Sequence, residues 1–304
     1  MCKNYHSDLI QRCQILLASL TGNLGRAGGG WRSGAFIALD GYALVGMQEK
    51  LGLFDIAWTA ARSFLDPLAV RKEFEKLFIP STIFHAVHGG LAEMECSAEW
   101  SDPRLPDGSA GHLAEALQKG HFPVSPAPGQ PPPEVIVNLC GSVLRHSRMG
   151  DRIRDSLFRQ ARLLVDIDFR MNETARHCDI LLPAAGWYAK IGIKYIAAFV
   201  PYITLADRAA EPLAESKPEW EIFSLLAARV GEEARKRGIS EVKGFGGGAH
   251  AIDLLGDRFS DGGRYGPGAQ EELLRFILQV SSASRGISLE DLRAQGGAMR
   301  IRSM

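Results

Sequence analysis

The chain has 304 residues, of which 46% are hydrophobic and 23% are charged, and its 35 basic residues balance its 35 acidic ones. These values indicate a globular protein long enough for two domains, and the zero net charge argues against a nucleic-acid-binding surface. No apolar run approaches the roughly 20 residues of a membrane-spanning helix. The first residues lack the apolar stretch of a secretory signal, so the default expectation is a cytoplasmic protein.

An amphipathic helix is predicted from Ser7 to about Leu20, because apolar residues recur on one helical face. The glycine-rich stretch "LTGNLGRAGGGWRSG" (20–34) follows it. A helix precedes these glycines and no Gly-Lys-Ser/Thr follows them, which excludes both a Rossmann fingerprint and a P-loop. Two interpretations stay open: a helix C-cap with tight turns, or a loop that lets a ligand approach the backbone at Gly28, Gly29 and Gly30.

A proline-rich segment, "PVSPAPGQPPP" (123–133), interrupts the chain. Its proline density excludes a helix or a central strand, so it is interpreted as an extended connector. It divides a helical and glycine-loop part (1–122) from a half-domain (134–238), which a helical tail (239–304) follows. In the tail, Ser288 and Asp291 form a predicted capping box.

The half-domain has the pattern of an α/β fold. Apolar runs at 134–139 and 162–168 flank a helical segment at 151–161, and a third run ends at Pro183. Strand, helix and strand in this order predict a parallel sheet with flanking helices, which is part of a doubly wound, Rossmann-like sheet. A long helix is predicted from about Pro218 to Gly238.

Polar residues follow the ends of the first two predicted strands. The first strand ends in "NLCGS", where Gly141 and Ser142 can present N–H groups to a phosphate. The second ends in "DIDFRMNET", where the Asp166 and Asp168 carboxylates can accept hydrogen bonds from ribose hydroxyls or from the edge of guanine. The alternative for Asp168 is that it caps the short helix after it.

Cysteine and histidine spacing predicts no metal site. The five cysteines include no Cys-x-x-Cys pair, and His85 and His88 have no third ligand in a known pattern. Cys140 and Cys178 are expected to be small buried residues rather than nucleophiles.

Three stretches together carry a family resemblance. They are "KNYHSDLIQRCQILLASLTGNLGRAGGGW", "VDIDFRMNETARHCDILLPAAGWY" and "AAEPLAESKPEWEIFSLLAARVG". Their order resembles the molybdopterin oxidoreductases, also called the dimethyl-sulfoxide-reductase family, and "NLCGS" followed by "DFRMNET" is most similar to the branch of nitrate reductase and ethylbenzene dehydrogenase. The resemblance spans about residues 3–231.

The resemblance implies a protein that binds two molybdopterin guanine dinucleotides around molybdenum and carries out two-electron oxygen-atom transfer or hydroxylation. Asp168 and Asn172 match family residues that hold a guanosine, and Asn138, Gly141 and Ser142 match the turn against its phosphates. Thr174 belongs to the same motif. Gly28, Gly29 and Gly30 match a loop near the pterin. Pocket candidates on the substrate side are His6, Trp31, Arg32, Ser33 and Gly34.

The chain also departs from the family pattern. Family members are more than twice as long, begin with a cysteine-rich iron–sulfur region, carry a molybdenum ligand before the stretch matched here and end with a domain that clamps both pterins. Ala189 stands where the family commonly has glutamate. The resemblance therefore implies a central fragment of a catalytic subunit that is inactive alone. Its expected partners are the rest of that subunit or an iron–sulfur electron-transfer subunit, with no nucleic acid and no membrane span.

Two alternatives stay open at this point. The chain is either part of a catalytic subunit or a non-catalytic module that holds the cofactor or contacts another subunit. The family branch also includes periplasmic enzymes, so the resemblance does not decide the compartment.

Overall fold

The computed structural model describes residues 7–26, 29–30, 79, 81–95, 97, 104, 108–122, 124–147, 149–195, 202–243, 249–281, 284 and 286–300. The chain divides into two compact units, which are described separately. The first comprises Met1–Tyr42, Ile193–Leu205 and Leu274–Met304, and the second comprises Ala43–Gly192 and Ala206–Leu273.

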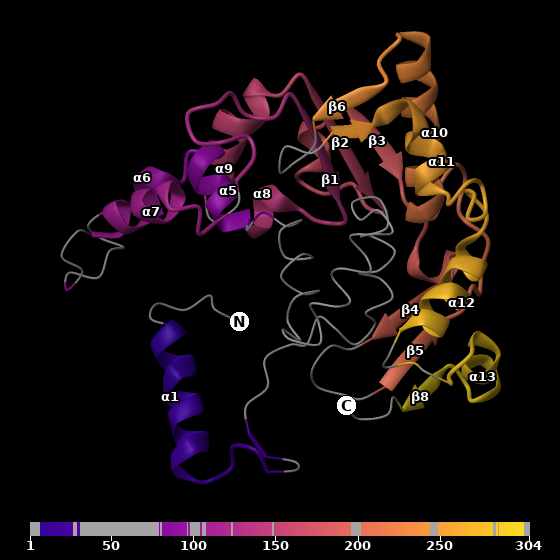
Figure 1. Cartoon of the computed structure of the whole chain (residues 1–304), viewed down its shortest axis with the longest axis horizontal. Coiled ribbons are helices and arrows are strands. Elements are labelled where there is room, and N and C mark those ends of the chain that lie inside the picture. Colours follow the sequence, from indigo (N-terminus) through magenta and orange to yellow (C-terminus); the bar gives the residue numbers. More distant parts are fainter. Residues whose placement is uncertain are drawn as a thin grey trace. The chain divides into compact units, whose positions relative to one another are not determined.

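In the described part of the chain, helices precede the first strand, and helices and short strands are interspersed after it (Figure 1). The helical elements are α1 (Ser7–Leu20), α5 (Ser81–His88), α6 (Ala92–Glu95), α7 (Gly108–Gln118), α8 (Val143–His146), α9 (Gly150–Ile153), a π-helical turn (Arg154–Phe158), 3-10 turns at Ala175–His177, Trp187–Ala189 and Ile252–Leu254, α10 (Glu219–Lys236), α11 (Leu255–Phe259), α12 (Gln270–Val280) and α13 (Leu289–Ala294). The strands are β1 (Val135–Leu139), β2 (Leu163–Asp168), β3 (Ile180–Pro183), β4 (Gly192–Tyr195), β5 (Tyr202–Ala206), β6 (Glu241–Lys243), β7 (Ala249–Ala251) and β8 (Ala298–Arg300).

The predicted parallel sheet is present in the second unit. Its strand order is β1-β2-β3, and both strand pairs are parallel. The register places Asn138 beside Asp166 and Asp168 beside Pro183. Ala184 follows the third strand and forms a parallel bridge with Lys217, which lies two residues before the start of α10. The α/β fold class is therefore confirmed.

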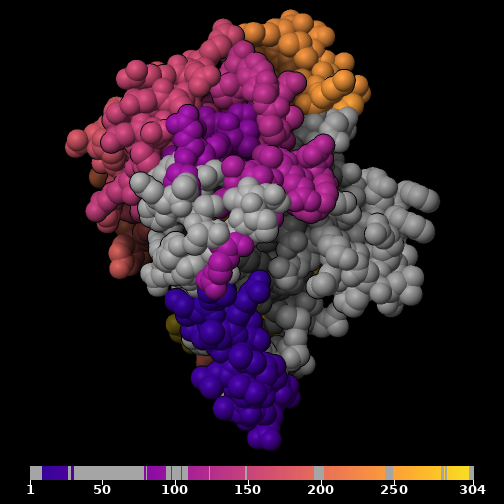
Figure 2. All heavy atoms as spheres, turned by 90° about the vertical axis from the view of Figure 1, so that its left-hand side faces the viewer, coloured from indigo at the N-terminus to yellow at the C-terminus, as the bar shows by residue number. Residues whose placement is uncertain are grey.

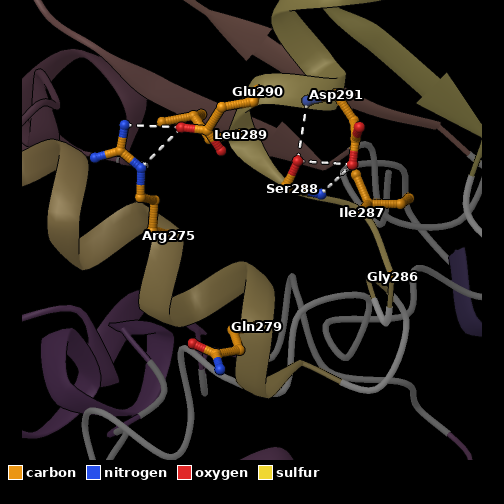
Figure 3. A pocket seen from close by; sticks show the side chains of 8 residues that line it. All are labelled: Arg275, Gln279, Gly286, Ile287, Ser288, Leu289, Glu290 and Asp291. Atoms are coloured by element: carbon orange, nitrogen blue, oxygen red, sulfur yellow. Dashed lines mark hydrogen bonds and ion pairs between the residues drawn. The ribbon is translucent and has the colours of Figure 1, made fainter.

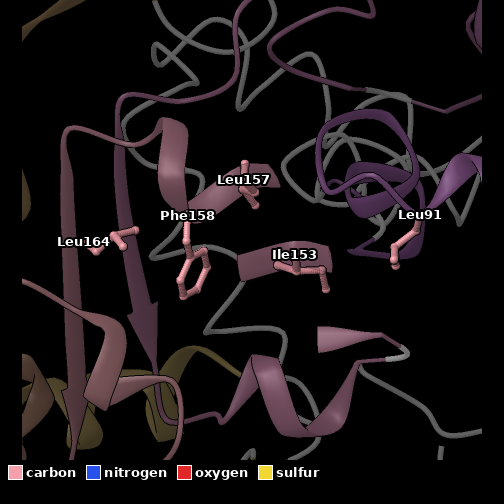
Figure 4. Packing of buried hydrophobic residues seen from close by; sticks show 5 residues of the cluster. All are labelled: Leu91, Ile153, Leu157, Phe158 and Leu164. Atoms are coloured by element: carbon pink, nitrogen blue, oxygen red, sulfur yellow. The ribbon is translucent and has the colours of Figure 1, made fainter. Parts of the chain in front are cut away.

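Helices cover both faces of β2. On one face, Leu164 packs with Ile153, Leu157 and Phe158 from α9 and the π-helical turn that continues it (Figure 4). On the other face, Val165 and Ile167 pack against α10 in a cluster that includes Ile222. Alternate residues of β2 thus enter opposite clusters, as a strand buried on both sides requires.

Coverage of the sheet is incomplete at β1. Val135, Val137 and Leu139 pair with Leu163, Val165 and Ile167, yet they are 54%, 44% and 45% exposed. The helix α1 in the first unit is similar, because Leu16, Leu17 and Leu20 are all exposed. Figure 2 draws the segment that contains this helix in indigo. The predicted amphipathic helix is confirmed, but its apolar face is not buried.

Several short strands were not predicted. The first unit contains a three-stranded sheet in the order β4-β5-β8, and β6 pairs with β7 in the second unit. The tail after residue 238 therefore contains strands as well as the predicted short helices, and the domain limits drawn from sequence stay a prediction. Within the described ranges, no helix has the length and apolar content to cross a bilayer.

Candidate functional site

The predicted strand-end residues come together at the carboxyl edge of the sheet in the second unit. Asn138 and Asp166 are direct neighbours in register, and Asp168 ends β2 two residues later. Parallel strands direct their carboxyl ends to one edge, which is where open α/β sheets bind ligands. The sequence therefore predicted correctly that these polar residues share one edge.

Asn138 and Asp166 are hydrogen-bonded to each other at this edge. The amide Nδ2 of Asn138 donates to the carbonyl oxygen of Gly141 at 2.6 Å and also to Oδ1 of Asp166. Asp166 is only 2% exposed. Burial raises the pKa of Asp166 and the nearby Asp168 charge adds to this effect, whereas the hydrogen bond from Asn138 opposes it. A buried carboxyl with a perturbed pKa at a strand end is a marker of a functional site.

Asp168 organises the turn after β2. Its Oδ1 accepts the backbone N–H of Arg170 at 3.1 Å, and its Oδ2 accepts Nδ2 of Asn172 at 2.8 Å. Asn172 in turn accepts the backbone N–H of Ala175, the first residue of the 3-10 turn, at 3.0 Å. The bond expected of a capping Asp168 is therefore made by Asn172. Each Asp168 oxygen keeps a second lone pair with which it can accept a ligand donor.

The turn after β1 leaves polar atoms without partners. Cys140 has a left-handed backbone conformation with φ of 51°, and Gly141 and Ser142 follow it. The Ser142 hydroxyl is buried and has no hydrogen-bond partner in the described part of the chain. The same part offers no acceptor to the backbone N–H groups of Gly141 and Ser142. Leaving a buried polar atom unpaired costs about 1–3 kcal/mol, so this turn is suited to a polar ligand.

Thr174 supports the site from inside. Its side chain is fully buried, and its hydroxyl accepts the backbone N–H of Leu144 at 3.2 Å. Its carbonyl accepts the thiol of Cys178 at 3.4 Å. Burial and the charges of Asp166 and Asp179 raise the pKa of Cys178 to about 11. Thr174 thus ties together the segments that follow β1 and β2, and its contact with a cofactor stays a prediction.

Cys140 differs from expectation because its side chain is exposed rather than buried. Its thiol lies 3.6 Å from Oε1 of Glu219, the first residue of α10. Partial burial and the Glu219 carboxylate raise the pKa of Cys140, which keeps the thiol protonated as a hydrogen-bond donor at neutral pH. The left-handed turn holds this side chain outward, and no local sequence pattern signals that.

Sequence reasoning also missed Lys190 and Glu219. The Lys190 ammonium forms an ion pair with Oε1 of Glu219 and lies 4.7 Å from the centre of the Trp187 ring. Trp187 in turn meets Phe169, from the turn after β2, at 6.4 Å between ring centres. These contacts join segments that are far apart in sequence. No local sequence pattern predicts them, because they depend on how the strands are arranged in the sheet.

The glycine loop lies in the first unit, where the structure describes part of it. Gly22 has φ of 64°, and the N–H groups of Gly22 and Asn23 bond back to Ser19 and Ala18. This is a Schellman cap, as the C-cap interpretation expected. A Cβ on Gly29 would lie 2.7 Å from the Asn23 carbonyl oxygen. Cofactor contacts of Gly29 and Gly30 stay predictions, and the candidates Gly28, His6, Trp31, Arg32, Ser33 and Gly34 lie outside the described residues.

A separate hollow of about 400 Å³ lies in the first unit between α12 and the start of α13 (Figure 3). Its polar side chains bond to one another: Arg275 donates to Glu290 at 3.0 and 2.8 Å, and Ser288 and Asp291 form the predicted capping box. These contacts pair four of the side chains that line the hollow with one another. Over the described residues, no three histidine, cysteine or acidic side chains are grouped to hold a metal ion.

Comparison with known proteins adds independent evidence. The family described as molybdopterin oxidoreductase matches residues 2–229. The respiratory nitrate reductase subunit alpha of Haloferax mediterranei is 32% identical over 248 residues, which cover 78% of this chain and 21% of that protein. The perchlorate reductase subunit alpha of Dechloromonas aromatica is 26% identical over 291 residues, which cover 95% of this chain and 28% of that protein.

The chain thus spans between a fifth and a third of the length of these two relatives. The family match nevertheless covers most of the chain, including all three parallel strands and the cluster at their carboxyl ends. On this evidence the chain belongs to the molybdopterin oxidoreductase family.

Proposed function

We propose that the cluster at the carboxyl ends of β1 and β2 binds the guanine dinucleotide end of a molybdopterin cofactor. On this proposal the chain is part of a catalytic subunit that performs two-electron oxygen-atom transfer or hydroxylation. The observation that supports this most is the buried, unpartnered Ser142 hydroxyl after β1, the strand that pairs with the one ending at Asp168.

The two turns have opposite hydrogen-bonding character, which suits the two ends of a nucleotide. The turn after β1 offers donors, namely the N–H groups of Gly141 and Ser142 and the Ser142 hydroxyl. Donors of this kind suit phosphate oxygens. The turn after β2 offers the acceptor oxygens of Asp168, held by Asn172. Such acceptors suit ribose hydroxyls and the N–H groups of the guanine edge.

The role of this chain is then to bind and orient. Bound molybdenum would supply the two-electron chemistry, because in cofactor enzymes the cofactor carries the difficult chemical step. Asn138 holds the Gly141 carbonyl and thereby the turn, while Asn172 fixes Asp168. Thr174 links the segments that follow the two strands, because its hydroxyl accepts the backbone N–H of Leu144. None of these groups needs to move a proton.

On this proposal, the groups that complete the catalytic site come from polypeptide outside this chain. The relatives are named as alpha subunits, and the chain matches 21% and 28% of two of them. We expect further polypeptide to supply the molybdenum ligand, the iron–sulfur electron path and the second pterin contact. The isolated chain should therefore hold nucleotide but not turn over substrate. A cofactor-holding or subunit-contact module without catalysis is the second candidate, and the same partial coverage favours it.

Substitution of Asp168 tests the proposed site. Asp168→Ala removes both acceptor oxygens, and we expect it to lower the guanine nucleotide retained by the chain purified from a molybdenum-cofactor-producing host by about tenfold. Nucleotide is measured as GMP released by acid hydrolysis. Asp151→Ala, which removes a carboxylate that is 87% exposed, is the matched control. Equal GMP content in both variants and the unsubstituted chain would reject the assignment of Asp168.

A further inference from the structure

Lys190 is a cation held close to the candidate site. It follows the 3-10 turn Trp187–Ala189, and its side chain is only 14% exposed. The Glu219 carboxylate contacts its ammonium from one side, and the Trp187 ring lies 4.7 Å away. A lysine with this burial and two partners has lost most of its conformational freedom, which reduces the entropy cost of binding a ligand.

Its partner Glu219 is anchored to the turn after β1. Oε1 of Glu219 also accepts the thiol of Cys140 at 3.6 Å, and Cys140 directly precedes Gly141 and Ser142. The adjacent Trp220 fixes the start of α10, because its indole N–H donates to the Gly266 carbonyl at 2.9 Å and its ring stacks on Phe259. One carboxylate therefore links Lys190 to the turn that carries the unpartnered donors.

The ion pair leaves Lys190 with binding capacity. An ammonium group has three N–H donors, and the contact with Glu219 uses one of them. The Glu219 charge balances the lysine in the free protein, and an incoming anion would share the remaining donors. Charge-assisted hydrogen bonds of this type are about twice as strong as neutral ones.

We propose that Lys190, positioned by Glu219, binds the phosphate of a nucleoside diphosphate group whose base lies at Asp168. This inference rests on the proposed function and adds a phosphate-contacting residue to it. Glu219 contacts both Lys190 and Cys140, the residue that precedes Gly141 and Ser142, and this link assigns the phosphate to the β1 side of the edge. The base is correspondingly assigned to the β2 side.

Calorimetric titration of the full chain with GDP and with guanosine separates the two roles. We expect Lys190→Gln to weaken GDP binding by about tenfold and to leave guanosine binding unchanged, because only GDP carries the phosphate. Lys190→Arg, which keeps the charge, should restore most of the GDP affinity. Glu219→Gln should weaken GDP binding to a smaller extent, since it frees the lysine without removing it. Lys217→Gln, which breaks a similar lysine–glutamate pair with Glu221, is the control.

The outcomes distinguish this inference from the proposed function. If the unsubstituted chain binds GDP and Lys190→Gln binds it equally well, the phosphate contact is wrong and the proposed function stands. If Lys190→Gln loses GDP and guanosine to the same extent, Lys190 is structural and the inference also fails. If the unsubstituted chain binds neither probe, the proposed function and this inference fail together. Circular dichroism of each variant confirms that it is folded.

Discussion

At the scale of single residues, the buried carboxyl of Asp166 is the least expected feature of the site. Its only hydrogen bond among the described side chains comes from Asn138, and burial raises its pKa. A carboxyl that is ionised at neutral pH despite burial destabilises the fold. Its presence is consistent with a binding role rather than a stabilising one.

Replacement of Asp166 tests this interpretation through the pH dependence of stability. The folded chain holds the Asp166 proton more tightly than the unfolded chain, so stability falls as pH rises from about 4, the ordinary pKa of aspartate, through the raised value. Asp166→Asn keeps the acceptor for Asn138 and removes the charge. We expect its melting temperature to exceed that of the unsubstituted chain at pH 7 and to match it near pH 4. A variant that melts lower at both pH values would contradict the sign of the effect.

The sequence predicted some of these residues and could not predict others. Asp166 and Asp168 are two apart at the end of an apolar run, and that spacing is enough to place both at one strand end. The sequence did not decide whether Asp168 caps the short helix after it, because an aspartate at this position can accept any of several nearby backbone N–H groups. In the structure Asp168 accepts the N–H of Arg170, and Asn172 accepts that of Ala175. Lys190 and Glu219 are far apart in sequence and are brought together by the fold, so no local pattern predicts their ion pair.

At the scale of elements, hydrophobic patterning predicted the longer ones. β1, β2 and β3, as well as α10, lie where continuous apolar runs or a helical period placed them, and the Ser288–Asp291 capping box of α13 is formed. The strands β4 to β8 were not predicted, although β5 is as long as β1 and β4 is as long as β3. Pairing with distant segments, such as β5 with β8, determines these strands more than their own sequence does.

The cluster between α9 and β2 should carry much of the stability of the second unit. Ile153 is fully buried in it, beside Leu157 and Leu164 (Figure 4). We expect Ile153→Ala to lower the free energy of unfolding by about 3 kcal/mol, because it removes buried methyl groups and leaves a cavity. Urea denaturation followed by circular dichroism measures this. Leu213→Ala, at a side chain that is 85% exposed, should change stability by less than about 0.5 kcal/mol. Equal effects of the two substitutions would show that the cluster is not a core.

At the scale of the whole molecule, each unit exposes apolar surface. In the second unit the uncovered stripe on β1 comprises Val135, Val137 and Leu139, and in the first unit the exposed face of α1 includes Leu16 and Leu20. Surfaces of this kind are usually covered by other polypeptide. The chain also matches only 21% and 28% of two relatives. Both observations support the proposal that the chain works together with further polypeptide.

Nucleotide selectivity tests whether the carboxyl ends of β1 and β2 bind guanine. The full chain is titrated with GDP and with ADP in a calorimeter under the same buffer and salt conditions. Asp168 offers acceptors to the N–H groups of the guanine edge, whereas adenine presents an acceptor at the corresponding ring nitrogen. We expect GDP to bind at least about tenfold more tightly than ADP. Equal affinity for the two nucleotides, or no binding of either, would contradict a guanine site at the carboxyl ends of β1 and β2.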